Sequence, residues 1–177
     1  MQTNVLALDL GTNTGFAVGR PGAIITGTQS FKNDRHSGGG MRFLRFKRFL
    51  SELHAATPIT EVVYEEVRRH LGTDAAHIYG GLQATLTAWC EEQTPKIPYE
   101  GVPVGTIKKY ATGKGNADKK TMIAAVRTWG YEPADDNEAD AIALWHLRAT
   151  TTFGESADQR PQSAKARVTS ELKELIA

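Results

Sequence analysis

The sequence predicts an α/β domain, a five-stranded sheet flanked by helices, on the strength of three observations. Residues 5–30 have the pattern of three short strands joined by tight turns, which is typical of an antiparallel meander. Helices with apolar residues at helical spacing then alternate with two more apolar strands. The length of 177 residues and the 40% apolar content fit one globular domain with an ordinary core.

The overall composition limits the classes of function and location. Lysine and arginine (21) balance aspartate and glutamate (20), so any nucleic-acid surface must come from local clustering. Cys90 is the single cysteine, which excludes an internal disulfide and a CxxC metal site and favours a reducing compartment. The sequence has no apolar run of about 18 residues and no signal-peptide pattern. We therefore expect a cytoplasmic protein without a membrane segment.

The first predicted strand ends in a carboxylate. Residues 5–8 (VLAL) form a continuous apolar run, as in a central strand buried on both faces. Asp9 follows directly, where a charge is unfavourable unless a partner compensates it. Residues 11–15 (GTNTG) then reverse the chain into a second strand, and residues 23–30 predict a third. Asp9 either bonds the N–H groups of this turn or serves as a metal-binding or phosphate-site carboxylate.

Residues 41–56 (MRFLRFKRFLSELHAA) predict a helix with an apolar face and a basic face. The apolar side chains that recur at helical spacing are Phe43, Phe46, Leu50 and Leu53. The arginines that fall three residues apart on another face are Arg42, Arg45 and Arg48. Such a face is either simply solvated or a contact surface for DNA, and both interpretations stay open.

Residues 61–66 (EVVYEE) predict a fourth strand that runs into two adjacent carboxylates. Along a strand, Val63 and Glu65 share one face, whereas Tyr64 and Glu66 share the other. The two glutamates therefore cannot have the same role.

A basic loop that contains Arg68 and Arg69 follows this strand and leads into a helix over residues 74–93. Gly80 and Gly81 lie in the middle of that helix, where each lowers helix propensity by about 1 kcal/mol. Their presence indicates either close packing against a neighbour or close approach of a ligand.

A fifth strand is predicted over residues 96–104, near an edge of the sheet, and a helix over residues 119–129. Lysines are clustered from residue 108, after this strand, to residue 120, in the first turn of the helix. The clustered side chains are Lys108, Lys109, Lys114, Lys119 and Lys120. Gly113 and Gly115 make this stretch flexible and would let its backbone approach a phosphate. It does not match the P-loop motif. The cluster is either a solvated loop or a phosphate contact.

The last core helix is predicted to begin after residue 135. Asp135 as N-cap and Glu138 three residues later fit a capping box, which accounts for both. Asp136 and Asp140 remain; they lie four residues apart on one face, where like charges repel. Asp140 is also surrounded by apolar residues, so it should need a cation.

The folded domain is predicted to cover residues 1–150. From residue 151 the composition turns polar, which indicates a C-terminal tail over residues 151–177 with a short helix over 170–176.

Three acids in apolar surroundings, Asp9, Glu65 and Asp140, suggest a metal site. No HExxH, GxSxG or GxGxxG motif is present, so zinc proteases, α/β-hydrolases and Rossmann enzymes lack their usual support. Ligand sets made of oxygen atoms alone suit Mg²⁺ or Mn²⁺. Two such ions a few ångströms apart are a common arrangement for cutting phosphodiesters.

The order of elements resembles the ribonuclease H-like fold, in which three antiparallel strands are followed by parallel ones. Residues 5–147 more specifically resemble the RuvC family of Holliday-junction resolvases, particularly its small phage-type members. The similar motifs are LALDLGTNTGFAV with Asp9, VVYEEV with Glu65, NEADAIAL with Asp140, and the basic segment GKGNADKK.

The resemblance implies a structure-selective endonuclease of DNA recombination and repair, which resolves four-way junctions by paired hydrolysis and acts as a homodimer. It implies two Mg²⁺ ions, with Mn²⁺ as an alternative. Asp9 would bridge the ions, and Glu65 and Asp140 would complete their shells with Asp136 or Asn137. Lys119 is a candidate for stabilising charge at the phosphate. The candidate contacts to branched DNA are Arg42, Arg45, Arg68, Arg69, Lys108, Lys114, Lys119 and Lys120.

Two positions depart from the family. Its members carry an acid or a histidine three residues before the last aspartate, where this chain has Asn137. Bacterial members carry an aromatic residue three positions after the strand glutamate, where this chain has Arg68. The identity of the fourth ligand and the cleavage sequence therefore stay open.

Three other functions compete with the resolvase interpretation. A related nuclease could act on forks, flaps or RNA–DNA hybrids, since fold alone does not fix the substrate. An inactive DNA-binding scaffold is favoured by Asn137 and disfavoured by the three acids. The segment DLGTNTG also resembles the first phosphate loop of actin- and Hsp70-type ATPases, but those need a chain about twice as long and a second phosphate motif.

Overall fold

The computed structural model describes residues 2–68 and 72–154. The strands are β1 (Val5–Asp9), β2 (Asn13–Arg20), β3 (Ala23–Ser30), β4 (Glu61–Glu66) and β5 (Tyr99–Pro103). They form one sheet in the order β3-β2-β1-β4-β5. The pairs β1–β2 and β2–β3 are antiparallel, whereas β1–β4 and β4–β5 are parallel. The predicted mixed five-stranded α/β sheet is therefore confirmed, with β5 at an edge.

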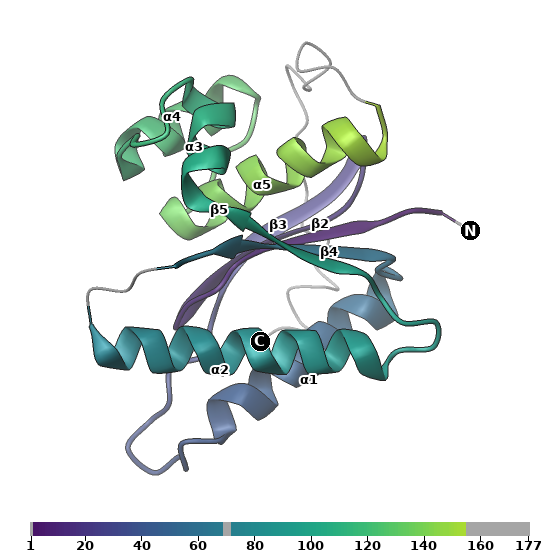
Figure 1. Ribbon diagram of the computed structural model, residues 1–177, viewed down its shortest axis with the longest axis vertical. Coiled ribbons are helices and arrows are strands. Elements are labelled where there is room, and N and C mark those ends of the chain that lie inside the picture. Colours follow the sequence, from purple (N-terminus) through teal and green to yellow (C-terminus); the bar gives the residue numbers. More distant parts are fainter. Residues whose placement is uncertain (1, 69–71, 155–177) are drawn as a thin grey trace.

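Helices cover both faces of this sheet (Figure 1). Two lie against one face: α1 (Met41–Ala56) and α2 (Thr73–Glu92). Two more lie against the opposite face: α3 (Val104–Thr112) and α5 (Asp136–Thr152). The helix α4 (Lys119–Thr128) packs on these two helices on the same side of the sheet. The helix α3 follows β5 without an intervening loop.

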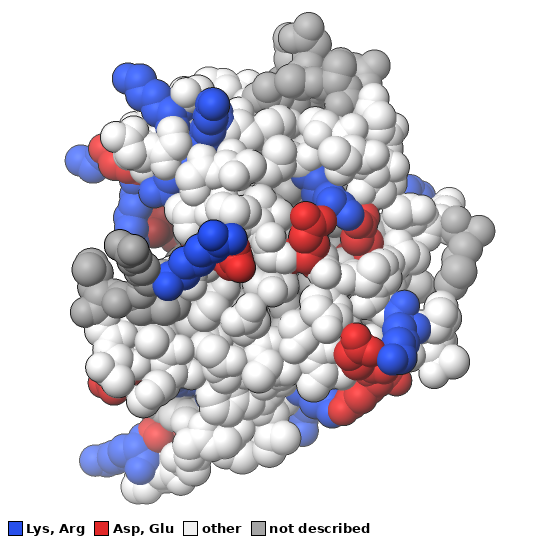
Figure 2. All heavy atoms as spheres, in the orientation of Figure 1, with Lys and Arg blue, Asp and Glu red and all other residues white. Residues whose placement is uncertain are grey.

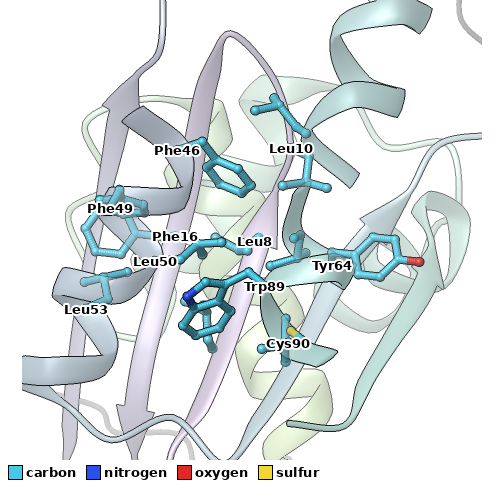
Figure 3. Packing of buried hydrophobic residues seen from close by; sticks show 14 of the residues in the cluster. Leu8, Leu10, Phe16, Phe46, Phe49, Leu50, Leu53, Tyr64, Trp89 and Cys90 are labelled. Atoms are coloured by element: carbon cyan, nitrogen blue, oxygen red, sulfur yellow. The ribbon is translucent and has the colours of Figure 1, made fainter. Parts of the chain in front are cut away.

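The alternation of side chains along β1 separates two cores. Leu6 and Leu8 face α1 and α2, where Phe16 and Phe49 meet edge-to-face with centroids 5.2 Å apart (Figure 3). Val5 and Ala7 face the opposite core, which is built on α5. Both faces of β1 are thus buried, which explains its uninterrupted apolar sequence.

The two glycines of α2 have different surroundings. A Cβ atom on Gly81 would lie 2.4 Å from the ring of Phe43, so α1 and α2 pack closely here. A Cβ on Gly80 would meet nothing within 4 Å. Close packing is therefore the reason for Gly81, and the packing interpretation is confirmed at that position.

Two expectations from the sequence concern a membrane segment and the C-terminal tail. Within the described residues, no helix is long and apolar enough to cross a membrane. The helix α5 ends at Thr152, and most of the predicted tail, with its helix over 170–176, lies outside the described residues. The boundary at residue 150 stays a prediction.

Candidate active site

Two of the three candidate acids lie on neighbouring parallel strands. Asp9 is the last residue of β1, and Glu65 comes directly after Tyr64, which pairs with Leu8. Because parallel strands end at the same edge of a sheet, the two acids are neighbours there. Val63, two residues before Glu65, faces α5. Because side chains two residues apart on a strand share a face, Glu65 lies on the α5 side of the sheet as well.

Glu66 has the separate role that strand alternation predicts. Tyr64, two residues before Glu66, packs in the core between the sheet and helices α1 and α2, so Glu66 lies on that face. Its carboxylate accepts a hydrogen bond from the Nε of Arg68 over 3.0 Å. The Arg68 side chain is exposed, and Arg69 lies outside the described residues.

The start of α5 is fixed to β3 by two buried or half-buried carboxylates. Asp135 caps the helix by accepting from the N–H of Glu138 over 2.9 Å, and it also accepts from Thr28 Oγ1 over 2.7 Å. Glu138 accepts from Thr26 Oγ1 over 2.6 Å and from the N–H of Ala134 over 2.8 Å. The N-cap prediction for Asp135 is confirmed. The reciprocal half of the capping box is wrong, because the Glu138 carboxylate bonds Ala134 and β3 rather than the cap residue.

Gly15 lets α5 cross directly over the sheet beside Asp9. It is the register partner of Asp9 on β2. A Cβ on Gly15 would lie 1.9 Å from the carbonyl oxygen of Asn137, which no side chain permits. The first turn of α5, with Asp136 and Asn137, is therefore brought to the same edge as Asp9.

The three acids influence one another strongly. Burial raises the pKa of Asp9 well above its usual range, and Glu65, Asp140 and Asp136 add to the effect. Burial and then Asp140 raise the pKa of Glu65 to about 7. Burial also raises the pKa of Asp140 to about 6, with a further increase from Asp136. The site is thus a concentration of negative charge that a cation would relieve.

One oxygen of this site has no partner at all within the described residues. Asp140 Oδ1 is buried and accepts no hydrogen bond, which is unfavourable unless something else compensates it. An oxygen-only donor set with an unpartnered buried carboxylate fits Mg²⁺ or Mn²⁺. Among residues 2–68 and 72–154, no group of three or more His, Cys, Asp or Glu side chains already has an arrangement that could hold an ion. A cation would therefore have to draw these carboxylates together.

Two lysines approach the carboxylates from α3 and α4. Lys119 Nζ lies 2.5 Å from Asp136 Oδ2. Lys108 lowers the pKa of both Glu65 and Asp140, so its ammonium lies near them. The sequence pattern predicted Lys108 as a DNA contact and did not place it beside the carboxylates.

Other candidate DNA-contacting lysines lie in the same region. Lys114 precedes α4 and Lys120 is its second residue. Figure 2 shows lysine and arginine side chains gathered over α3 and α4, at the sheet edge that carries the acids. Their contact with DNA stays a prediction.

Two arginines of α1, Arg42 and Arg45, have structural partners. Arg42 Nε donates to the carbonyl oxygen of Phe31 over 3.0 Å. Arg45 donates to the carbonyl of Lys32 over 3.1 Å and to Ser37 Oγ over 2.7 Å. Both therefore hold the loop between β3 and α1. This does not test their predicted contact with DNA.

Similarity to known proteins is found in the structure and not in the sequence. No family model and no curated protein matches the sequence. Thermus thermophilus RuvC in complex with Holliday junction substrate matches with a TM-score of 0.70 at 18% identity, covering 86% of this chain and 97% of that one. The chain has the RuvC fold.

Two further solved structures agree with this assignment of the RuvC fold. A second Thermus thermophilus RuvC structure has a TM-score of 0.66 at 21% identity, over 86% of this chain and 97% of that one. The yeast mitochondrial Holliday junction resolvase Ydc2 has a TM-score of 0.55 at 13% identity, over 86% and 82%. The predicted ribonuclease H-like fold is confirmed.

The raised pKa values predict that the metal-free protein loses stability as pH rises. The folded state holds protons on Glu65 up to about pH 7 and on Asp140 up to about pH 6, above their ordinary values of 4.5 and 3.8. At pH values between the unfolded and the folded pKa of each group, the folded state binds more protons than the unfolded state. The free energy of unfolding therefore falls as pH rises through this range. We expect a decrease of about 1–3 kcal/mol from pH 5 to pH 7.5.

Urea unfolding in EDTA at the two pH values measures this decrease. The Glu65→Gln variant should show a distinctly smaller decrease, because it lacks a group whose pKa of about 7 lies inside this pH range. A wild-type stability that stays level or rises over this range would contradict the electrostatic description of the site.

Proposed function

We propose that this chain is a metal-dependent endonuclease that resolves four-way DNA junctions by paired phosphodiester hydrolysis. The observation that carries the proposal is the unpartnered, buried Oδ1 of Asp140 beside Asp9 and Glu65, whose pKa values are raised. The RuvC fold, shared with a structure that contains a junction substrate, supports the choice of substrate.

Each residue has a specific part in this proposal. Asp9, Glu65 and Asp140 would hold Mg²⁺ or Mn²⁺, and the bound ions would supply an activated water and stabilise the leaving oxygen. Glu138 and Gly15 keep the first turn of α5 beside Asp9, so that Asp140 reaches the same centre. Lys108 and Lys119 supply positive charge for the phosphate that undergoes cleavage.

The proposal includes a homodimer. One chain offers one centre with these acids, whereas resolution of a junction requires nicks in two opposed strands. Light scattering on the complex with a four-way junction measures how many chains are bound, and a single chain on each junction would contradict the paired mechanism.

The test of function compares four labelled substrates of equal length: a four-way junction, a linear duplex, a fork and an RNA–DNA hybrid. Each is incubated with the protein in Mg²⁺ and in EDTA. The proposal expects symmetric paired nicks in the junction, at least about tenfold faster than any cut in the duplex, and none in EDTA. Cutting of the fork or hybrid alone would replace the substrate. Tight junction binding without cutting would favour the scaffold alternative.

The basic segment predicts a salt-dependent contact with DNA. The affinity for DNA falls as salt rises, and Lys120→Ala should make this fall shallower. The magnitude of the slope of log affinity against log salt should decrease by about 1, because one phosphate contact is lost. The matched control is Lys47→Ala, since Lys47 is a lysine of α1 paired with Glu92 over 2.7 Å. Fluorescence anisotropy at several salt concentrations measures the slopes. Equal slopes for the wild type and Lys120→Ala would show that Lys120 contacts no phosphate.

A further inference from the structure

We propose that Asp136 is a positioning residue that holds the Lys119 ammonium beside the carboxylate centre and is not itself a metal ligand. This inference rests on the proposed function, because it concerns how the same centre receives a phosphate. Of the two residues that the sequence offers as the fourth ligand, Asp136 and Asn137, the inference removes Asp136 and leaves Asn137 as the candidate.

The first support is the contact between the two side chains. Lys119 Nζ lies 2.5 Å from Asp136 Oδ2, so the two side chains form a direct ion pair. The Asp136 side chain is 25% exposed and the Lys119 side chain is 78% exposed. Asp136 therefore lies at the rim of the site and fixes an ammonium that would otherwise extend into solvent.

The backbone at both ends of this pair is held in place. Asp118 caps α4 by accepting from the N–H and the hydroxyl of Thr121, over 2.8 and 2.7 Å, so the position of Lys119 at the helix start is defined. Asp136 is the first residue of α5, directly after the cap Asp135 that is bonded to β3. The flexible part that remains is the lysine side chain, which Asp136 restrains.

The second support is the contrast with Asp140, one helical turn further along α5. Asp140 has a buried oxygen without a partner, as a ligand needs before the ion binds. Asp136 already has a cation as its partner. Binding an ion through Asp136 would break that pair and bring the ion close to the ammonium, and both changes are unfavourable.

The third support is the electrostatic influence of the Lys119 ammonium on the acids of the centre. Its charge lowers the pKa of Asp9, and Asp140 and Asp9 raise the pKa of Lys119, so the ammonium lies close to the whole centre. A phosphate brought to Asp9 and Asp140 would thus meet this ammonium. An exposed ion pair contributes little to folding, so stability does not account for it.

The test is a double-mutant cycle with Asp136→Asn, Lys119→Ala and the combination of both. The readouts are the single-turnover cleavage rate at saturating protein and the affinity for Mn²⁺ measured by calorimetry without DNA. We expect Asp136→Asn to lower the rate about tenfold and Lys119→Ala to lower it at least as much. The double variant should match Lys119→Ala, because Asp136 acts through that lysine. Mn²⁺ affinity should stay within about twofold in Asp136→Asn.

Conservative variants and a surface pair provide the controls. Asp136→Glu keeps a carboxylate for Lys119 and should recover most of the rate that Asp136→Asn loses. Glu91→Gln removes a carboxylate that contacts Lys96 over 2.7 Å far from the acids, and it should change neither readout.

The contrary results are equally specific. A drop of about tenfold or more in Mn²⁺ affinity for Asp136→Asn, with additive losses of rate in the double variant, would make Asp136 a ligand and overturn the inference. If the wild type cuts no DNA, the proposed function fails, whereas the Mn²⁺ affinities still decide whether Asp136 is a ligand.

Discussion

Asp9→Asn should lower the rate of junction cleavage by at least about a thousandfold, which corresponds to roughly 4 kcal/mol of lost transition-state stabilisation. Asp9 is the acid whose pKa responds to all the others, namely Glu65, Asp140 and Asp136. The amide that replaces it has the same shape but no charge, so ions would be held weakly. The measurement is the single-turnover rate on a labelled four-way junction in Mg²⁺.

The same variant should fold at least as well as the wild type. Burial and the neighbouring carboxylates disfavour the charged form of Asp9 and raise its pKa, so a neutral amide there should raise the stability of the metal-free protein at pH 8 by about 1 kcal/mol or more. Junction affinity in EDTA should be kept or increased, because a negative charge is removed from a phosphate-binding surface. A variant that cuts at more than about a tenth of the wild-type rate would exclude Asp9 from the chemistry.

Gly15→Ala should destabilise the protein by roughly 2–4 kcal/mol. The added methyl group would meet the carbonyl oxygen of Asn137 at 1.9 Å and its carbonyl carbon at 2.2 Å. Both atoms belong to backbone that Glu138 and Asp135 fix to β3, so they cannot move without loss of those bonds. We also expect weaker Mn²⁺ binding, since Asp140 would be displaced with the first turn of α5.

The matched control is Gly80→Ala in α2. Nothing lies within 4 Å of the added atom there, so the change should stabilise the helix by up to about 1 kcal/mol. Urea unfolding of both variants measures the difference. Equal stability of Gly15→Ala and the wild type would show that α5 does not rest on Gly15.

Local sequence patterns predicted the strand half of the site and the approximate fold. Strand alternation separated Glu65 from Glu66, and the structure places them on opposite faces, with Glu66 bonded to Arg68. The apolar run before Asp9 predicted a central strand, and β1 lies in the middle of the sheet. These inferences succeeded because they depend on period and burial, which neighbouring residues determine.

Contacts between distant segments could not be predicted in the same way. The hydrogen bond from Thr26 to Glu138 joins residues that are 112 positions apart in the sequence. Because of this bond, Glu138 connects α5 to β3 and does not complete a capping box. The Arg42 and Arg45 bonds to the loop before α1 likewise depend on where that loop packs. The pairing of Lys119 with Asp136 requires α4 and α5 to be placed first.

The most direct test of the central claim is a calorimetric titration of Mn²⁺ into the metal-free wild type and Asp140→Asn at pH 6.5. The account predicts saturable binding to the wild type with release of protons, because Glu65 has a pKa of about 7 and must lose its proton to bind. It predicts at least tenfold weaker binding to Asp140→Asn. Equal affinity of the two proteins would show that the ion, if it binds, binds elsewhere, and would contradict the proposed centre.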